Sequence, residues 1–149
     1  MEQPIRVLTA GGVEDWTLEV YDAPDYDALT LRSPGSAEWT AAGADLFDAL
    51  LGLRRQVEPA GIRLCCNGSR RDVWPSQLLR AMSDGGSAYV LRKGRRPTSR
   101  HLVEILAPAD CALVVSIEEQ RAYVEKWWRS ATTWRLPLYA LSRPFRPYR

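Results

Sequence analysis

The chain has 149 residues and a formal net charge of +2, with 46% hydrophobic and 26% charged residues. This length suits one domain that buries roughly two-thirds of its unfolded surface, so neither a metal ion nor a disulfide is needed to hold it. No apolar stretch approaches the roughly 20 residues that cross a bilayer, and the N-terminal MEQPIRV lacks the basic and apolar regions of a signal peptide. We therefore expect a soluble, cytoplasmic protein without membrane contact.

The charge is unevenly distributed along the chain. Residues 1–53 contain ten carboxylates and two arginines, whereas residues 54–149 contain 18 basic and eight acidic side chains. This asymmetry predicts an acidic face and a basic face, unless the two halves pack together and pair their charges. Arginine outnumbers lysine by 18 to 2. That bias fits a coding preference as well as selection for bidentate phosphate contacts, so it does not discriminate between functions.

Three N-terminal strands are predicted, over residues 5–9, 16–21 and 28–32. Gly11-Gly12 and Pro24-Asp25 form the turns between them. The alternation of large and polar residues in the second segment is typical of a strand with one wet face. A simple meander would connect the three.

A helix is predicted over residues 43–58, where apolar residues recur at helical spacing and Pro59-Ala60-Gly61 follows as a stop. Gly52 in its interior costs about 1 kcal/mol relative to alanine, which indicates a close approach to the sheet. The apolar positions, including two that extend the pattern backward, are Trp39, Ala42, Leu46, Leu50, Leu53 and Val57. The side chains that we expect to face water are Arg54, Arg55 and Glu58.

A strand, a helix and another strand follow over residues 62–66, 76–83 and 88–91. The helix ends at Asp84-Gly85-Gly86. The connection is too short to decide between parallel and antiparallel pairing of the two strands. The helix residues that we expect to face inward are Leu78, Leu79 and Met82.

Two further helices are predicted. Thr98 or Ser99 would cap the first, which ends before Pro108, and Ser116 with Glu119 forms an S-x-x-E capping box for the second. The apolar residues of the first are Leu102, Val103, Ile105 and Leu106, and those of the second are Ile117, Val124, Trp127 or Trp128, and Ala131.

These elements predict an α/β (α+β) fold: a two-layer sandwich with an antiparallel or mixed sheet of four or five strands and helices mainly on one face. Residues 1–133 would form a single α/β domain. Residues 134–149 would form an extended arm rich in arginine, proline and aromatic residues, because three prolines interrupt it and no carboxylate occurs after residue 125.

The three cysteines are predicted to be unpaired. Cys65 and Cys66 are adjacent within an apolar strand, where they can hardly bridge each other. We expect their side chains to point to opposite faces, one buried and one more accessible. A bond between either of them and Cys111 would contradict this prediction.

Catalytic and cofactor signatures are sparse. Cys65 or Cys66 precedes a basic loop that would lower a thiol pKa, but the only histidine, His101, has no orienting partner near it in the sequence. Zinc-ligand spacing and the GxxxxGK[ST] and GxGxxG phosphate-binding motifs do not occur. We therefore predict no cofactor, no metal site and no catalytic residue, and retain an enzyme based on Asp72 or Glu104 as a lesser hypothesis.

The strongest candidate site is the junction between the strand at 62–66 and the helix at 76–83. Two guanidinium groups, a hydroxyl group and a helix N-terminus converge there and would hold a phosphate or another anion. In the structural alternative, the aspartate pairs with a neighbouring arginine and the tryptophan wedges the loop onto the core. The junction residues are Ser69, Arg70, Arg71, Asp72 and Trp74.

Two other groups of basic residues would extend this site. If the strand ending at Leu91 neighbours the one ending at Cys66, the basic turn after it lies beside the junction. The C-terminal segment RPFRPYR in a polyproline II conformation could place its arginines on phosphates and its aromatic rings on bases. Alternatively, it could pack its aromatic rings across its own domain and pair its arginines with the carboxylates of the acidic N-terminal third of the chain. The turn contains Arg92, Lys93, Arg95, Arg96 and Arg100, and the arm contains Arg143, Arg146 and Arg149.

These observations lead to three functional hypotheses. The first is a non-catalytic interaction module, such as an adaptor, an inhibitor or an immunity-type protein, that docks on a protein partner through an acidic face or a basic loop. The second is a nucleic-acid or nucleotide-phosphate binding protein that uses the clustered arginines. The third is an unrecognised enzyme. The carboxylate-rich first third of the chain favours the first over the second, because it would repel a polyanion.

Overall fold

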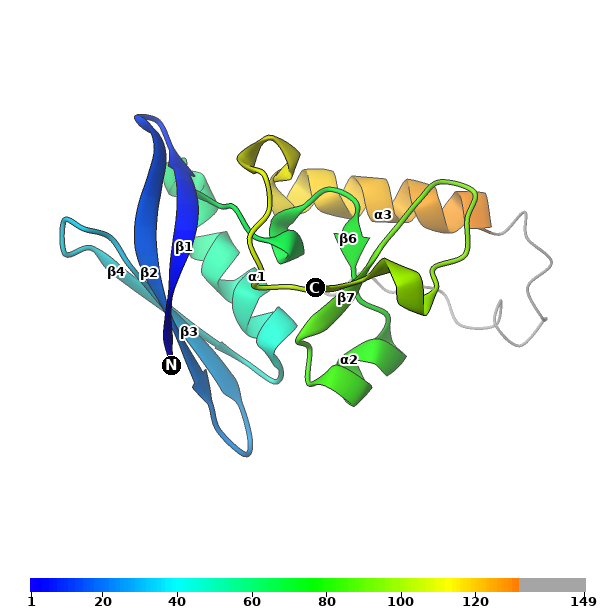
Figure 1. Cartoon of the computed structure of the whole chain (residues 1–149), viewed down its shortest axis with the longest axis horizontal. Coiled ribbons are helices and arrows are strands. Elements are labelled where there is room, and N and C mark those ends of the chain that lie inside the picture. The colour runs from blue at the N-terminus through cyan, green and yellow to red at the C-terminus, as the bar shows by residue number, and fades with distance from the viewer. Residues whose placement is uncertain (132–149) are drawn as a thin grey trace.

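The computed structural model describes residues 1–131, which form two antiparallel sheets and three α-helices (Figure 1). The first sheet has five strands in the order β4-β3-β2-β1-β5. The predicted α+β class and five-stranded sheet are confirmed, with antiparallel pairing throughout. The strands of this sheet are β1 (Glu2–Thr9), β2 (Gly12–Asp22), β3 (Asp27–Arg32), β4 (Glu38–Gly43) and β5 (Arg63–Leu64).

The first strands form the predicted meander, with one apolar and one polar face. Leu18 and Leu29 are fully buried on the face that packs against α1 (Leu46–Val57). On the other face, Arg32 forms ion pairs with carboxylates from three other strands. Its partners are Glu2 at 3.2 Å, Glu19 at 2.7 Å and Glu38 at 2.8 Å.

Trp39 and Ala42 belong to the strand β4 and not to the helix in which we predicted them. Trp39 stacks on Trp16, with 5.6 Å between the ring centroids. Helix α1 begins only after Asp45, whose side chain accepts a hydrogen bond from the Asp48 N–H at 2.8 Å. The N-cap therefore fixes the start of the helix, whereas apolar spacing alone extended it too far.

Gly52 lies against β4, as its place in the helix predicted. A Cβ atom at this residue would meet the Cβ atom of Ala41 at 3.2 Å. The absent side chain thus allows α1 to approach the sheet closely.

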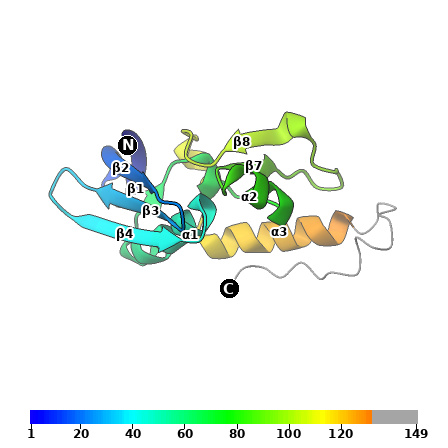
Figure 2. The same ribbon diagram turned by 90° about the horizontal axis from the view of Figure 1, so that it is seen from below.

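The second half of the chain adds a small antiparallel sheet that we did not predict, with the order β6-β7-β8. Helix α3 runs alongside this half from the vicinity of α1 to the far end of the molecule, as Figure 1 and Figure 2 show. The elements are β6 (Val73–Trp74), α2 (Gln77–Ser83), β7 (Ser87–Val90), β8 (Leu102–Glu104) and α3 (Ile117–Ala131). The Ser116 capping prediction is confirmed, since its Oγ accepts a hydrogen bond from the Glu119 N–H at 3.2 Å.

The segment after Thr98 is a strand, so the predicted helix is wrong. Thr98 caps only a short 3₁₀ turn, Ser99–His101, after which β8 pairs with β7. Ile105 is fully buried, and its N–H donates to the Gly86 carbonyl oxygen at 3.0 Å. Four apolar residues within five positions fit a strand as well as one face of a helix, and the pairing with β7 decides between them.

Helix α2 buries less than predicted. Leu79 is buried, but Leu78 and Met82 are 70% and 76% exposed, so their predicted inward orientation is wrong. The helix has seven residues, and Leu79 and Arg80 are its buried positions. Several apolar residues of the other predicted helices are buried as expected, namely Leu50, Leu53, Val124 and Trp127.

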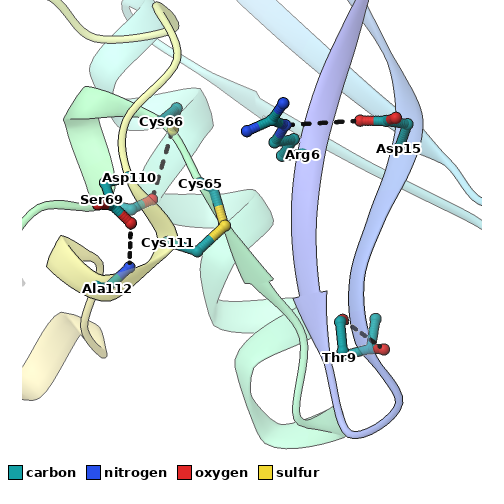
Figure 3. Close-up of a disulfide and its surroundings, with 10 residues drawn as sticks. Arg6, Thr9, Asp15, Cys65, Cys66, Ser69, Asp110, Cys111 and Ala112 are labelled. Atoms are coloured by element: carbon teal, nitrogen blue, oxygen red, sulfur yellow. Dashed lines mark hydrogen bonds and ion pairs between the residues drawn. A yellow bond between two sulfur atoms is a disulfide. The ribbon is translucent and has the colours of Figure 1, made fainter.

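Cys65 and Cys111 form a disulfide, with their Cα atoms 4.9 Å apart (Figure 3). The prediction that all three cysteines are unpaired is therefore wrong. Cys66 is a free thiol 3.5 Å from Ser69 Oγ. Cys65 and Cys66 are both buried, so the predicted difference in their accessibility is also wrong.

A backbone contact between distant segments explains the disulfide. The Ala109 N–H donates to the Cys65 carbonyl oxygen at 3.0 Å, and the Asn67 N–H donates to the Ala107 carbonyl oxygen at 2.9 Å. This pairing brings Cys111 beside Cys65 across a sequence separation of 46 residues. Nothing local in the sequence indicated it.

A buried arginine connects the two halves of the fold. Arg54 is 1% exposed, so the prediction that it faces water is wrong. Gln120, which accepts one of its hydrogen bonds, donates in turn to the carbonyl oxygens of Gly68 and Val73. The acceptors of Arg54 are Glu58 Oε1 at 2.9 Å, Gln120 Oε1 at 2.5 Å, Val115 O at 2.9 Å and Gly68 O at 3.3 Å.

The predicted C-terminal arm, with Arg143 and Arg146, lies outside the described residues. Within residues 1–131, no helix has the length and apolar character needed to span a membrane.

Candidate functional site

Arg71 is the exposed cation of the junction. Arg70 and Asp72 form a bidentate ion pair, with N–O distances of 3.0 and 2.9 Å. Arg71 instead points its guanidinium toward Glu119 at 3.9 Å, and its side chain is 59% exposed. The local pairing of Asp72 is the contact that the structural alternative predicted, so a partner would meet Arg71 rather than Arg70.

Ser69 and Trp74 anchor the junction to the core. Ser69 is 1% exposed, and Trp74 is 3% exposed with its ring edge-on to Phe47, 5.1 Å between centroids. The expectation that the Ser69 hydroxyl is presented to a ligand is therefore wrong, because the hydroxyl lies against the buried Cys66 thiol. Both residues position the loop.

The fold brings the junction and the basic turn to one end of the small sheet. β6 and β7 pair antiparallel, and the ladder continues where the Leu91 N–H donates to the Asp72 carbonyl oxygen at 2.6 Å. The end of β6 that follows Arg71 therefore lies beside the end of β7 that precedes Arg92. The strand beside β7 on this side is β6, whereas β5, the strand near Cys66, belongs to the other sheet, so the condition of our hypothesis is not met.

One face of α3 supports both basic segments. Glu119, Tyr123, Trp127 and Ser130 follow one another at spacings of four, four and three residues, a stripe about 16 Å long. Beyond the Glu119–Arg71 ion pair, the contacts are Tyr123 Oη to Leu91 O at 2.9 Å, Trp127 Nε1 to Arg92 O at 3.0 Å and to Arg95 O at 3.3 Å, and Gly94 N–H to Ser130 Oγ at 3.1 Å.

Tyr123 is the supporting residue that sequence reasoning missed. Burial and the Asp72 carboxylate raise the pKa of its hydroxyl, which remains a neutral donor to Leu91. The four-residue spacing from Glu119 through Tyr123 to Trp127 was a signal that could have identified it.

The cations of the basic turn are exposed, and none has an ion-pair partner among the carboxylates of residues 1–131. Their backbone is fixed on α3, so the charges project from a supported loop. We call the following six residues the basic surface: Arg71, Arg92, Lys93, Arg95, Arg96 and Arg100.

The charge asymmetry of the sequence persists in the fold. Between described residues, Arg80–Asp45, at 2.6 Å, is the ion pair that joins residues 1–53 to the later chain, and the others form within one part or the other. The described residues therefore do not show the alternative that we considered, in which the charges of the two halves pair extensively with each other.

The candidate nucleophiles and base are engaged elsewhere. Cys65 is bonded to Cys111, and burial raises the pKa of the Cys66 thiol, which disfavours the reactive thiolate. His101 Nδ1 lies 3.2 Å from Thr98 Oγ1 and 3.4 Å from its N–H, as part of a turn cap.

The structure also contains an acidic cluster that we did not predict. Asp22, Asp27 and Asp84 each place a carboxylate oxygen within 4.8 Å of the others. Burial and the carboxylates of Asp84 and Asp22 raise the pKa of Asp27 from 3.8 to about 6. The predicted turn at Pro24-Asp25 could have placed the first two opposite each other, but nothing in the sequence indicated the third.

Comparison with known proteins assigns no function: the chain matches no protein-family model, and no curated protein is significantly similar to it.

Proposed function

We propose that this chain is a non-catalytic interaction module, of the adaptor, inhibitor or immunity type, that docks on an acidic surface of a protein partner through the basic surface. The observation that carries the proposal is the set of six exposed cations beside one another on a loop and junction that α3 holds in place.

The support from α3 favours binding. Trp127 and Ser130 fix the backbone at Arg92, Gly94 and Arg95. A loop that is already ordered loses less conformational entropy on association, so more of the interaction free energy appears as affinity. Complementary charges also accelerate encounter with an acidic partner.

Two features favour a protein over a nucleic acid. Glu119 lies beside Arg71, and the acidic first sheet belongs to the same molecule, so a long polyanion would meet repulsion as well as attraction. Within the described residues, the exposed aromatic side chains are Tyr21 and Tyr26, at the β2–β3 hairpin rather than beside the basic surface. Among residues 1–131, no exposed aromatic ring on the basic surface therefore offers a platform for stacking of bases.

The cytoplasmic location stays a prediction. The Cys65–Cys111 bond counts against it. Disulfides are more typical of oxidising compartments.

Charge reversal tests the proposed function. We expect Arg71→Glu and Arg95→Glu each to weaken binding to a poly-glutamate peptide by about tenfold or more, because each replaces an attractive charge by a repulsive one. Unfolding free energies should change by only about 0–1 kcal/mol, since both side chains are exposed. Fluorescence anisotropy with labelled peptide and urea denaturation would measure the two effects.

The matched control is Arg55→Glu, an exposed arginine on α1 outside the basic surface. It should bind the peptide like the wild type. Equal losses in all three variants would contradict a localised site. Tighter binding of single-stranded RNA or duplex DNA than of the peptide at the same salt, with a steep loss as salt rises, would support the nucleic-acid hypothesis instead.

A further inference from the structure

The acidic cluster joins segments that are far apart in the chain. Asp22 ends β2 and Asp27 begins β3, directly opposite each other in the hairpin. Asp84 caps the C-terminus of α2 in the left-handed conformation, with φ of 52°. Carboxylate oxygens of the three lie within 4.8 Å of one another.

Both segments are held in place by their backbones. Asp27 also pairs with Gly43 of β4, which fixes the hairpin end within the sheet. The Asp84 carbonyl oxygen accepts a hydrogen bond from the Leu46 N–H at 3.1 Å, which fixes the turn after α2 at the start of α1. At Gly85, a Cβ atom would lie 2.8 Å from the Phe47 nitrogen, so this turn is tightly packed. The three carboxylates therefore meet through the fold itself.

Asp27 is the unusual member of the cluster. The residue is 4% exposed, and none of the ion pairs within residues 1–131 includes it; the groups that hydrogen-bond with its carboxyl group are the carboxyls of Asp22 and Asp84. Its carboxylate faces those of Asp22 and Asp84. Nearby Asp45, which is also shielded, has Arg80 as a bidentate partner at 2.6 and 2.8 Å. A buried carboxylate normally has such a partner, because burial of an unpaired charge is costly.

We propose that Asp22, Asp27 and Asp84 together bind a divalent cation, with Ca²⁺ preferred. The ligand set consists of carboxylate oxygens alone, which suits hard cations rather than zinc or copper. Oxygens on opposite sides of one Ca²⁺ ion are roughly 5 Å apart, whereas those around Mg²⁺ are roughly 4 Å apart at most. The carboxylate oxygens of the cluster lie within 4.8 Å of one another, a spacing that one Ca²⁺ ion can span, and Ca²⁺ accepts a more flexible ligand geometry than Mg²⁺. Water would complete the coordination.

A bound ion would fasten the β2–β3 hairpin to the turn between α2 and β7. Because the unfolded chain does not bring these residues together, the ion would bind the folded state selectively and stabilise it. This consequence can be measured without knowledge of any partner, and it is independent of the basic surface.

Thermal unfolding of the full chain, first treated with EDTA and then titrated with CaCl₂, MgCl₂ or MnCl₂, tests the proposal. We expect the melting temperature to rise with CaCl₂ concentration, and less with MgCl₂. Asp27→Asn should remove this response, while Asp25→Asn, an exposed carboxylate in the same turn, should retain it. Because Asp27→Asn relieves repulsion, it should also melt at a higher temperature than the wild type in EDTA. If this variant fails to fold, Asp84→Asn replaces it.

Terbium luminescence gives a second readout. Tb³⁺ substitutes for Ca²⁺, and its emission is sensitised by nearby tyrosines. Tyr21 and Tyr26 adjoin Asp22 and Asp27 in sequence, and their rings lie 5.9 Å apart. We expect emission from the wild type and the Asp25→Asn variant that Ca²⁺ displaces, and at least about tenfold weaker Tb³⁺ affinity in Asp27→Asn. No melting shift with any of the three ions, or equal responses in the Asp25 and Asp27 variants, would overturn the proposal.

Discussion

Replacing Arg54 by methionine should lower the free energy of unfolding by about 3–5 kcal/mol, the range expected when one member of a buried charged pair is removed. Arg54 is 1% exposed and donates to Glu58, Gln120 and two carbonyl oxygens. Methionine retains most of the apolar volume but donates no hydrogen bond, so buried acceptors lose their donor. Urea denaturation monitored by tryptophan fluorescence would measure the loss.

The neighbouring Arg55→Met is the matched control, because Arg55 is exposed on the same helix. It should change stability by no more than about 1 kcal/mol. Gln120→Leu should destabilise less in the Arg54→Met background than in the wild type, since the two side chains share one hydrogen bond. An Arg54→Met variant as stable as the control would show that the network does not hold the two halves together.

Local signals predicted the longer elements well. The capping box at Ser116 and the four-residue apolar spacing in α1 each act within a few residues, so the sequence alone contains them. The errors occurred where a distant partner decides the structure. β5 and β6 have two residues each, and β8 has three. Segments this short become strands only because another strand pairs with them.

In the candidate site, too, the features set by neighbouring residues were predictable and those set by distant partners were not. Charge runs in the sequence identified the exposed turn around Arg95, because a loop rich in cations remains in water. The sequence could not show that the pairing of β6 with β7 would place Arg71 at the same end of the small sheet as this turn. Nor could it show that Asp72 would form an ion pair with Arg70. The acidic cluster required Asp84 to meet the first hairpin, and that contact depends on the packing of the α2–β7 turn on α1.

Removal of the disulfide by Cys111→Ala should cost about 4 kcal/mol of unfolding free energy. The bond closes a loop across a sequence separation of 46 residues, and cross-linking a loop of that length restricts the unfolded chain by about this amount in the chain-entropy model. It also ties the end of β5 to the segment that leads into α3 (Figure 3). Protein prepared without reductant and unfolded in urea would provide the measurement.

A reducing agent separates the bond from the side-chain change. Dithiothreitol should destabilise the wild type to about the level of Cys111→Ala and leave that variant unaffected, because only the wild type has a bond to lose. Thiol labelling in urea should find one free thiol, Cys66, before reduction and three after it. Three thiols before reduction, in protein exposed to oxidant, would show that Cys65 and Cys111 do not pair, and the segment from Ala107 to Ala109 would then be held by its backbone hydrogen bonds alone.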